Sequence, residues 1–485
     1  METLFQLDQR LSFFLLISLS VLWIALGFFF GRKNKNFEDH AVAGRNIGLA
    51  LGSATAVATW ITSNTTMLAP QFALQLGVWG MLAYSTASLG LFLFAPLADR
   101  IQKLMPNGFT SGDFVRLRYG KGSWSVYMVI TLFYSLTWLV SMAMAGGVLL
   151  ETLSGITYEV GMSAILFACV IYTMVGGMKA VIGTDFIQSL IILIGITIVG
   201  FIVLDRIPAS TIFETTKKEA PELVNVLFPA ALMALFNNLL FGLGEVFHNN
   251  VWWSRAFSIR KGQAKKSFLI GGFAWLPIPV AAGFISLAVF HMDLFVPKAD
   301  MVGPLVISHL LGSGGSILVF IIIFCSLASS IDSLLAAISD LLTQDVYRAQ
   351  FHPKADEKKL KKVAMLITLG LGLLTWLVCL PRIGTLATVL FFAGPLVGSL
   401  IWPIITGLFW KKASSTGALL AMLLGSGIGL WSYFSIGWYV ASLIGAAVSM
   451  GVVLVFTWLK PDQFQWKHLN PQLGAQAVSA RRRKK

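Results

Sequence analysis

The chain has 485 residues, of which 56% are hydrophobic and only 12% are charged. Soluble proteins carry about 25% charged residues, so this composition excludes a soluble enzyme or binding module and predicts an all-α integral membrane protein. The formal net charge of +14 lies mostly in short segments between apolar runs. That distribution indicates a membrane topology signal and argues against nucleic acid as a partner.

Apolar segments of about 18 residues or more, the length that a helix needs to cross a bilayer, recur about 13 times. Their approximate ranges are 11–31, 46–75, 79–98, 122–150, 157–176, 180–204, 223–248, 267–291, 314–344, 362–380, 385–410, 415–433 and 437–459. The first follows no basic segment and precedes no small-x-small site, so we expect it to be retained as a helix. The loops are too short for a soluble domain, which predicts a single transmembrane domain over residues 1–485.

Basic residues are divided very unevenly between the two sides of the predicted bundle. With the N-terminus outside, all but six of the 36 Lys and Arg residues fall on the inner side. The six on the outer side are Arg10, Arg206, Lys217, Lys218, Lys298 and Arg382. Because cytoplasmic loops are rich in Lys and Arg, we expect a plasma (cell inner) membrane protein with a cytoplasmic C-terminus. The basic run at 481–485 is then either a surface anchor or a partner-binding tag.

Two spans contain stretches that do not suit a continuous helix. The second span contains the run Thr62–Thr66, which is poor in helix formers, and in the seventh Gly242 and Gly244 lie beside Glu245. Interrupted spans at matching positions of two halves mark the binding site of a transporter. They would be the first and sixth helices of a ten-helix core built from two inverted repeats of five. The predicted segments are an extra helix (11–31), the repeats (46–204 and 223–410), two C-terminal helices (415–459) and a basic tail (460–485).

A polar stripe runs along the segment 321–348, within an otherwise apolar span. Residues that share one helix face there are Ser326, Ser329, Ser330, Ser333 and Asp340, with Asp332 beside them. A broken helix frees backbone carbonyls, and carbonyls with hydroxyls would make a cage of neutral oxygens for a monovalent cation such as sodium. Alternatively, each serine bonds its own helix or a neighbouring one. Asp340 is expected to serve either an exit path or a structural bond.

Acidic residues inside spans are costly and are usually functional or paired. Asp185 and Asp332 are therefore expected to bind a cation, relay a proton or stabilise a neighbouring helix. Glu245 is expected either to bind a polar solute or to cap the broken seventh span. Its polar neighbours are His248, Asn249 and Asn250.

The remaining residue types offer no catalytic or metal chemistry. Cys169, Cys325 and Cys379 lie in apolar runs and are predicted to be buried, and the six histidines are scattered. No G-x-x-x-x-G-K-[ST] motif occurs, so ATP-driven transport within this chain is not expected. Trp252 and Trp253 are expected in the interfacial aromatic belt. No catalytic residues are predicted.

In these motifs the chain resembles the sodium:solute symporter family, whose members include sodium-coupled carriers of sugars, proline, pantothenate, sialic acid and urea. The similar motifs are Gly-Gly-x-Lys-Ala…Thr-Asp at 176–185 and a serine pair ahead of Thr343-Gln-Asp-Val-Tyr347. The thirteen-span layout extends the likeness to the rest of the chain. The resemblance implies a LeuT-type fold of five plus five helices.

The resemblance also implies two ion sites. The residues that match the main sodium site are the carbonyl-bearing Ala58 and Ile61 and the hydroxyl-bearing Ser326, Ser329 and Ser330. Asp185 looks like the aspartate of a second cation site, which Asp332 and Ser333 would complete. An aspartate at 332 departs from the serine found there in other members.

Within the family the urea-type branch looks nearest. Gly244-Glu-Val-Phe-His-Asn-Asn-Val-Trp-Trp-Ser-Arg-Ala256 is similar to that branch, although Glu245 replaces a threonine and Asn249 an aspartate. The solute is expected between the two breaks. The residues predicted to contact it are Thr62, Thr65, Trp138 and Glu245.

The sequence therefore predicts a sodium-coupled symporter that imports a small polar solute, urea-like or another small organic solute, by alternating access. Its expected partners are sodium ions, the solute and the lipid bilayer. A rival hypothesis is proton coupling on the same fold, with Asp185 and Asp332 titrating. Two further candidates are a transporter-like membrane sensor and, least favoured, a membrane enzyme.

Overall fold

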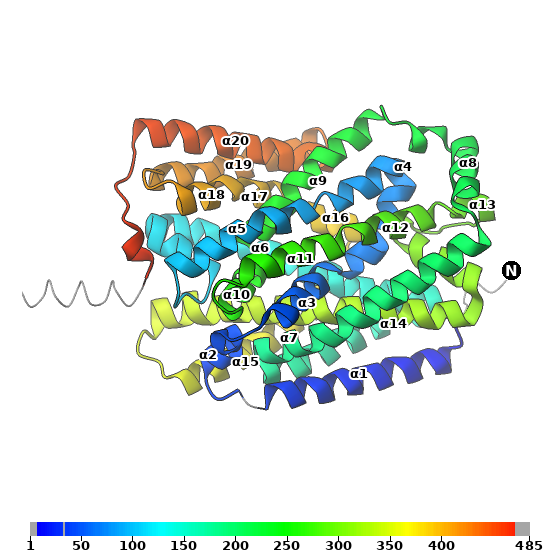
Figure 1. Cartoon of the computed structure of the whole chain (residues 1–485), viewed down its shortest axis with the longest axis horizontal. Coiled ribbons are helices and arrows are strands. Elements are labelled where there is room, and N and C mark those ends of the chain that lie inside the picture. The colour runs from blue at the N-terminus through cyan, green and yellow to red at the C-terminus, as the bar shows by residue number, and fades with distance from the viewer. Residues whose placement is uncertain (1–6, 33, 471–485) are drawn as a thin grey trace, which may run out of the picture.

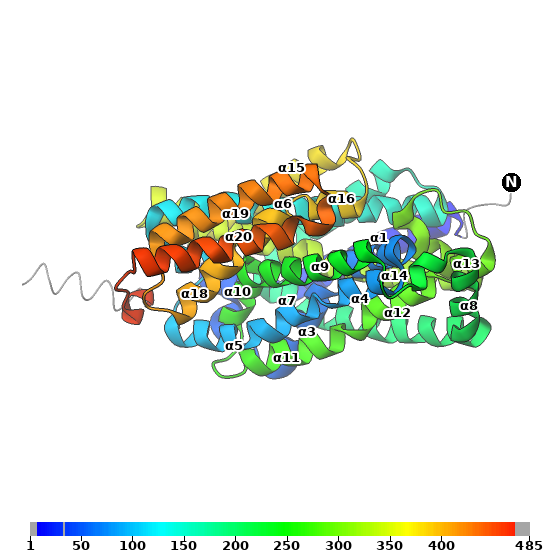
Figure 2. The ribbon, with the colours of Figure 1, turned by 90° about the horizontal axis from the view of Figure 1, so that it is seen from above.

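The computed structural model describes residues 7–32 and 34–470, and its regular elements are helices packed in one bundle (Figures 1 and 2). Up to the second break they are α1 (Gln9–Gly31), α2 (Phe37–Val42), η1 (Ala43–Arg45), α3 (Leu49–Trp60), η2 (Asn64–Leu68), α4 (Ala69–Ser85), α5 (Ser88–Leu104), α6 (Ser111–Ser154), α7 (Tyr158–Arg206), α8 (Ala209–Glu219), η3 (Pro221–Val224) and α9 (Pro229–His248). Beyond it they are α10 (Asn250–Ser258), α11 (Ala264–Trp275), α12 (Pro277–Ser286), α13 (Val289–Met292), η4 (Ala299–Met301), α14 (Val302–Leu341), η5 (Leu342–Phe351), α15 (Glu357–Cys379), α16 (Leu386–Phe391), α17 (Gly394–Ser399), α18 (Ile401–Phe409), α19 (Ser415–Ser435), α20 (Trp438–Leu459) and η6 (Trp466–Leu469). Within these ranges there is no β-strand, which confirms the predicted all-helical fold.

Eleven helical stretches of the described residues are long and apolar enough to cross a bilayer. Four of them exceed 40 residues, whereas about 20 residues suffice for one crossing. Each of these four bends at a glycine with positive φ: Gly77, Gly120, Gly177 or Gly312. At Gly77 and Gly177 the bend divides two crossings, and at Gly120 and Gly312 it separates a shorter helix from one crossing. Counted in this way, the stretches give the 13 crossings that the sequence predicts.

The two ends of the described chain lie at opposite ends of the bundle. In Figure 1, α1 begins at the right, beside the N mark, and the red η6 lies at the left. A chain that crosses the membrane an odd number of times starts and finishes on opposite sides, so this arrangement agrees with 13 crossings. The predicted basic run at 481–485 lies outside the described residues.

The polar segment of α14 lies at the centre of the bundle. Every residue from Ile322 to Leu341 is buried, whereas Phe14 on α1, Phe201 on α7 and Trp458 on α20 are exposed and face the lipid side. Polar groups on a helix that is buried all round cannot reach water. The serines and aspartates of α14 must therefore find their partners inside the protein.

The first break follows Trp60, as the sequence predicts for this span. Ile61 leaves the helical conformation (φ −80°, ψ 79°), and a π-helical turn, η2, begins at Asn64. Regular helix resumes in α4 with Pro70 in its first turn, where a proline removes no helical hydrogen bond. The break therefore spans only residues 61–63, but it separates two helices of one crossing.

The second break lies at Asn249 rather than at Gly242 and Gly244, so its predicted position was wrong. Asn249 adopts an extended conformation (ψ 132°) between α9 and α10. The two glycines instead permit close helix packing, because a Cβ on Gly242 would lie 2.7 Å from Ala87 Cα and one on Gly244 would lie 2.5 Å from the Val397 carbonyl oxygen. The prediction mistook a packing requirement for a helix breaker.

The adjacent tryptophans are also not interfacial. Trp252 and Trp253 are fully buried; the ring centres of Trp252 and Trp60 are 4.9 Å apart, and those of Trp253 and Phe114 are 5.2 Å apart. Because α10 begins only at Asn250, these rings enter the bundle core instead of the membrane surface. The three cysteines are free and buried, as predicted.

Candidate functional site

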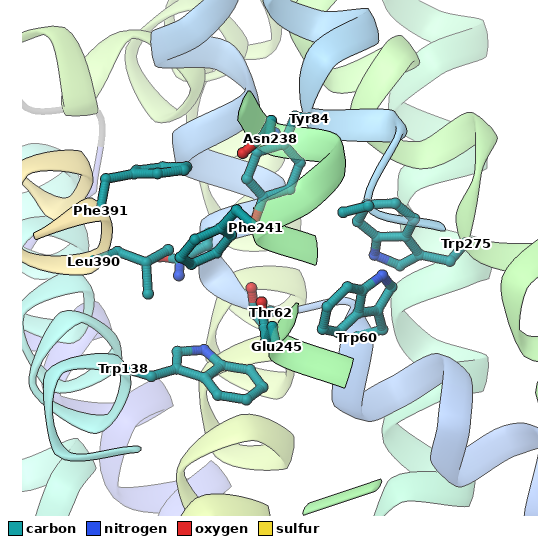
Figure 3. Close-up of a pocket in the computed structure, with 12 residues that line it drawn as sticks. Trp60, Thr62, Tyr84, Trp138, Asn238, Phe241, Glu245, Trp275, Leu390 and Phe391 are labelled. Carbon is teal, nitrogen blue, oxygen red and sulfur yellow. The ribbon is translucent and has the colours of Figure 1, made fainter. Parts of the chain in front are cut away.

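A cavity with an empty volume of about 370 Å³ lies between the two breaks (Figure 3). Its lining residues are Trp60, Thr62, Asn64, Tyr84, Ala87, Trp138, Asn238, Phe241, Glu245, Trp275, Leu390 and Phe391. Several helices and the first break supply them, from both predicted halves of the chain. Figure 3 shows Thr62 and Glu245 between the indole rings of Trp138 and Trp60. The cavity therefore combines an aromatic wall with a few polar groups, the usual make-up of a small-molecule site.

Three of the four residues predicted to contact solute line this cavity: Thr62, Trp138 and Glu245. Thr65 does not. Its hydroxyl donates to the Trp60 carbonyl (3.0 Å) and accepts from the Trp275 indole N–H (3.3 Å). Thr65 therefore holds the first break in shape from behind the cavity wall.

Glu245 is 6% exposed and forms no ion pair with a described Lys, Arg or His. It does not cap the broken helix, because Asn249 does so by accepting from the Val251 N–H (2.9 Å). His248 and Asn250 are also engaged elsewhere: His248 Nδ1 contacts the Gly244 carbonyl, and Asn250 donates to Ala337. Of this predicted polar group, only Glu245 faces the cavity.

Two residues of the predicted sodium site, Ser329 and Ala58, are in contact beside the first break. Ser329 Oγ donates to the Ala58 carbonyl (3.0 Å), from α14 to α3. In a continuous helix that carbonyl would accept from Thr62 N–H, which here lies against Thr65 Oγ1 instead. The Ile61 carbonyl is freed in the same way, because Thr65 N–H bonds the Thr62 carbonyl (2.9 Å). At the break, the carbonyls of Ala58 and Ile61 therefore lose their helical hydrogen-bond donors. These are the two carbonyls that were predicted to bind sodium.

The other two serines of this group point along their own helix. Ser326 Oγ donates to the Ile322 carbonyl (2.8 Å), and Ser330 Oγ donates to the Ser326 carbonyl (2.9 Å). Both side chains are buried beside Ser329, and a hydroxyl that donates in this way still offers an oxygen lone pair. Among the described residues no group of three His, Cys, Asp or Glu side chains is placed to hold a metal ion. The chemistry of this place is that of neutral oxygens.

The predicted second cation site is occupied by the side chain of Arg255, which lies in the motif at 244–256 but was not predicted as a site residue. Arg255, on α10, lies with one guanidinium nitrogen 3.1 Å from Asp185 Oδ2 and 2.6 Å from Ser333 Oγ. Its Nε donates to Thr55 Oγ1 (3.0 Å), which in turn donates to Asp185 Oδ2 (2.5 Å). The side chains of Arg255 and Asp185 are both 0% exposed. A fixed cation therefore already neutralises Asp185.

Asp332 lies on the far side of Ser333 from this pair and is held by neutral donors. Tyr172 donates to Asp332 Oδ2 (2.9 Å), Thr184 approaches the same oxygen (3.4 Å) and Ser333 approaches Oδ1 (3.3 Å). The predicted trio of Asp185, Asp332 and Ser333 is thus brought together. With Arg255 it forms one buried network containing two carboxyl groups and one guanidinium.

A signal for Arg255 was present in the sequence. The motif at 244–256 contains this arginine, but it falls between the predicted spans 223–248 and 267–291 and was counted among the basic residues of the inner side. What sequence spacing could not show was that the second break would direct α10 against α3 and α7. Arg255 reaches Asp185 across 70 residues of chain.

Asp340, which the sequence could assign to no partner, lies beside His40. Its Oδ1 is 3.7 Å from His40 Nδ1, and both side chains are almost completely buried. The contact joins α2 to α14, beyond the ion-site residues along α14. Asp340 therefore has His40 as a close neighbour, although the two side chains are farther apart than a hydrogen bond.

Two solved structures resemble this fold over most of its length. A Na⁺-coupled sialic acid symporter in a substrate-bound outward-open state matches with a TM-score of 0.78 and 17% identity, covering 93% of this chain and 98% of the other. Mhp1, a nucleobase-cation-symport-1 family transporter in a closed conformation, matches with a TM-score of 0.56 and 14% identity, covering 90% and 98%. At these identities the likeness shows the fold alone, which is the predicted LeuT-type arrangement.

Relatives in sequence are transporters of urea and of proline. The urea-proton symporter DUR3 of Oryza sativa subsp. japonica is 24% identical over 94% of this chain and 70% of its own length. The urea active transporter of Saccharomyces cerevisiae is 25% identical over 82% of this chain, which spans only 58% of that protein. The osmoregulated proline transporter OpuE of Bacillus subtilis is 26% identical over 86% of this chain and 88% of its own.

The structure has two broken helices, a buried serine on a freed carbonyl, and a cavity between the breaks. The similar solved structures and the relatives in sequence are all transporters. A family model matches residues 40–425, most of the chain and all of the site residues described above. This protein belongs to the sodium:solute symporter family.

Proposed function

We propose that this protein couples inward sodium movement to the uptake of a small polar solute, urea-like or another small organic solute, by alternating access. The observation that carries the proposal is the bond from Ser329 to the Ala58 carbonyl. It joins one hydroxyl of α14 to one of the carbonyls that the first break releases. Sodium would be held there by Ala58, Ile61, Ser326, Ser329 and Ser330.

One short break would serve both ligands. The Ile61 carbonyl belongs to the proposed ion site, and the next residue, Thr62, lines the cavity. A cation that fixes Ala58 and Ile61 also fixes the backbone of Thr62, so ion binding would order the solute pocket. At 100 mV one charge crossing the membrane supplies about 2.3 kcal/mol, enough for a solute gradient of roughly fifty-fold.

The cavity supports a small solute. Bulky aromatic side chains make up much of the cavity wall, so we expect a planar solute of a few heavy atoms to fit better than a sugar. That size agrees with the names of the urea-transporting relatives and supports a urea-like substrate.

Proton coupling is the second candidate, and two observations favour it. One relative is named a urea-proton symporter, and Arg255 already occupies the place of a second cation beside Asp185. Asp332, held only by Tyr172, Thr184 and Ser333, would then carry the proton. In the sodium version these aspartates and Ser333 would hold a second sodium, but only if Arg255 gave way. One coupling cation, at the first site, is therefore the simpler proposal.

Uptake into proteoliposomes tests the choice of ion. Radiolabelled urea uptake at fixed pH and fixed membrane potential should fall to background when choline replaces sodium. Undiminished uptake in choline would overturn sodium coupling and favour the proton. Asp185→Asn then tests the second cation: an unaltered ratio of sodium to solute would make Asp185 purely structural.

The orientation of the chain in the plasma (cell inner) membrane is part of the proposal. The N-terminus would lie outside and the C-terminus in the cytoplasm, as the excess of basic residues in inner loops predicts. The end of the bundle that carries Lys354, Lys411 and Lys460 would then face the cytoplasm. Sodium entry would begin at the opposite end, near Arg382.

A further inference from the structure

Glu245 is a buried acid without a counter-ion in the wall of the proposed solute cavity. Its side chain is 6% exposed, and no described basic group lies within ion-pair distance of it. None of the twelve residues that line the cavity is basic. The Tyr134 hydroxyl lies near the carboxyl group but forms no hydrogen bond with a described group, and it could supply a neutral donor but no charge.

Aromatic rings surround this carboxyl group on the cavity side. Trp60 packs edge-on against Trp138, with ring centres 6.4 Å apart, and lies 5.7 Å from the ring centre of Trp275. Tyr84 packs against Trp275 at 6.0 Å. Faces of Trp and Tyr rings attract cations, most strongly where water is excluded.

A carboxylate in such a place needs either a proton or a positive partner, because an isolated buried charge is very costly. For the buried Asp185 the chain itself provides that partner, which is Arg255. At Glu245 the unfilled space beside the carboxyl group is the cavity. If Glu245 is ionised, its positive partner must therefore come from whatever enters the cavity.

We propose that the solute is a small organic cation with N–H donors, such as an amidinium or guanidinium group, whose charge pairs with Glu245 inside the aromatic cage. This inference rests on the proposed transport function and narrows its substrate class. Guanidinium has the planar shape and size of urea, so it fits the same limited room. Asn238 helps to select donors, because its amide N–H₂ is used by the Ala83 carbonyl (2.8 Å), which leaves its oxygen as an acceptor.

Matched pairs of charged and neutral compounds test the idea on the purified full chain. Binding of radiolabelled guanidinium is measured by scintillation proximity and competed with acetamidinium, urea and acetamide. The cations should compete at concentrations at least tenfold below those of their neutral isosteres. Equal competition by the neutral compounds, or absence of saturable guanidinium binding, would overturn the proposal.

Variants locate the effect at Glu245. Glu245→Gln should abolish the preference for cations, whereas Glu245→Asp, which keeps the charge, should retain it. Glu222→Gln changes an exposed glutamate on η3 and should behave as the unmodified protein. A cation preference that survives Glu245→Gln would sink the assignment. If that variant does not fold, the ratio measured on the unmodified chain still decides.

Proteoliposome uptake separates this inference from the transport function itself. Ion-driven uptake of guanidinium in preference to urea supports both. Ion-driven uptake that prefers urea overturns the substrate class and leaves the transporter standing. Saturable guanidinium binding without any ion-driven uptake overturns the transport function but leaves the cation pocket in place.

Discussion

The guanidinium of Arg255 lies 3.1 Å from the carboxylate of Asp185, and neither side chain is exposed. Removing one partner of a buried ion pair costs about 3–5 kcal/mol because the other charge is left unpaired. Arg255→Gln should therefore lower the unfolding temperature in detergent markedly, while Arg260→Gln, at the exposed end of the same segment, should not. In Arg255→Gln/Asp185→Asn the loss should be smaller than the sum of the single losses. Additive losses would mean that the two residues do not interact.

The serine that reaches across the first break should set the affinity for sodium. A hydrogen-bonding partner of a charged group is worth about 1.5–3 kcal/mol, so Ser329→Ala should raise the sodium concentration for half-maximal uptake by about tenfold or more. Ser330→Ala should act in the same direction. Ser339→Ala is the control, because Ser339 Oγ bonds only the Ala336 carbonyl of its own helix (2.9 Å). Unchanged sodium dependence in Ser329→Ala would remove the proposed cage.

The turn at Gly177 should tolerate an added side chain less well than the turn at Gly120. Its φ is 53°, and an added Cβ would lie 2.6 Å from the His40 ring. Gly177→Ala should combine backbone strain of about 1–2 kcal/mol with a clash that disturbs the His40–Asp340 contact. Gly120→Ala carries strain (φ 85°) with no atom within 4 Å of the new Cβ, so its unfolding temperature should fall less. An equal fall in both would show that only strain matters.

Cysteine labelling can check the membrane orientation, because Cys169, Cys325 and Cys379 are all buried and should give little background. Lys217→Cys and Lys354→Cys each place a thiol at an exposed position. A membrane-impermeant maleimide should label the first in intact cells and the second only after permeabilisation. The reverse pattern would invert the topology.

The sequence predicted features that depend on local composition or on a motif. The excess of basic residues and the apolar lengths led to 13 crossings, and the hydroxyl-rich run after Trp60 located the first break. The motif match brought Ser329 together with Ala58, 271 residues away. None of these required knowledge of how helices pack.

The errors concern packing between distant segments. Gly242 and Gly244 were interpreted as breakers because a sequence does not show that Ala87 and Val397 press against them. Trp252 was placed at the membrane surface because the break that carries it inward was predicted too early in the chain. Arg255 was overlooked for the same reason, since only the true position of the break aims it at Asp185.

The first break has a thermodynamic consequence that does not depend on which ion binds there. Ile61 and Thr62 share one peptide unit, so an ion and a solute that each fix this unit must influence each other's affinity. Binding linkage is reciprocal: whatever factor the ion contributes to solute affinity, the solute returns to ion affinity. Under the proposed function, this short stretch of irregular backbone would therefore couple the binding equilibria of the ion and the solute.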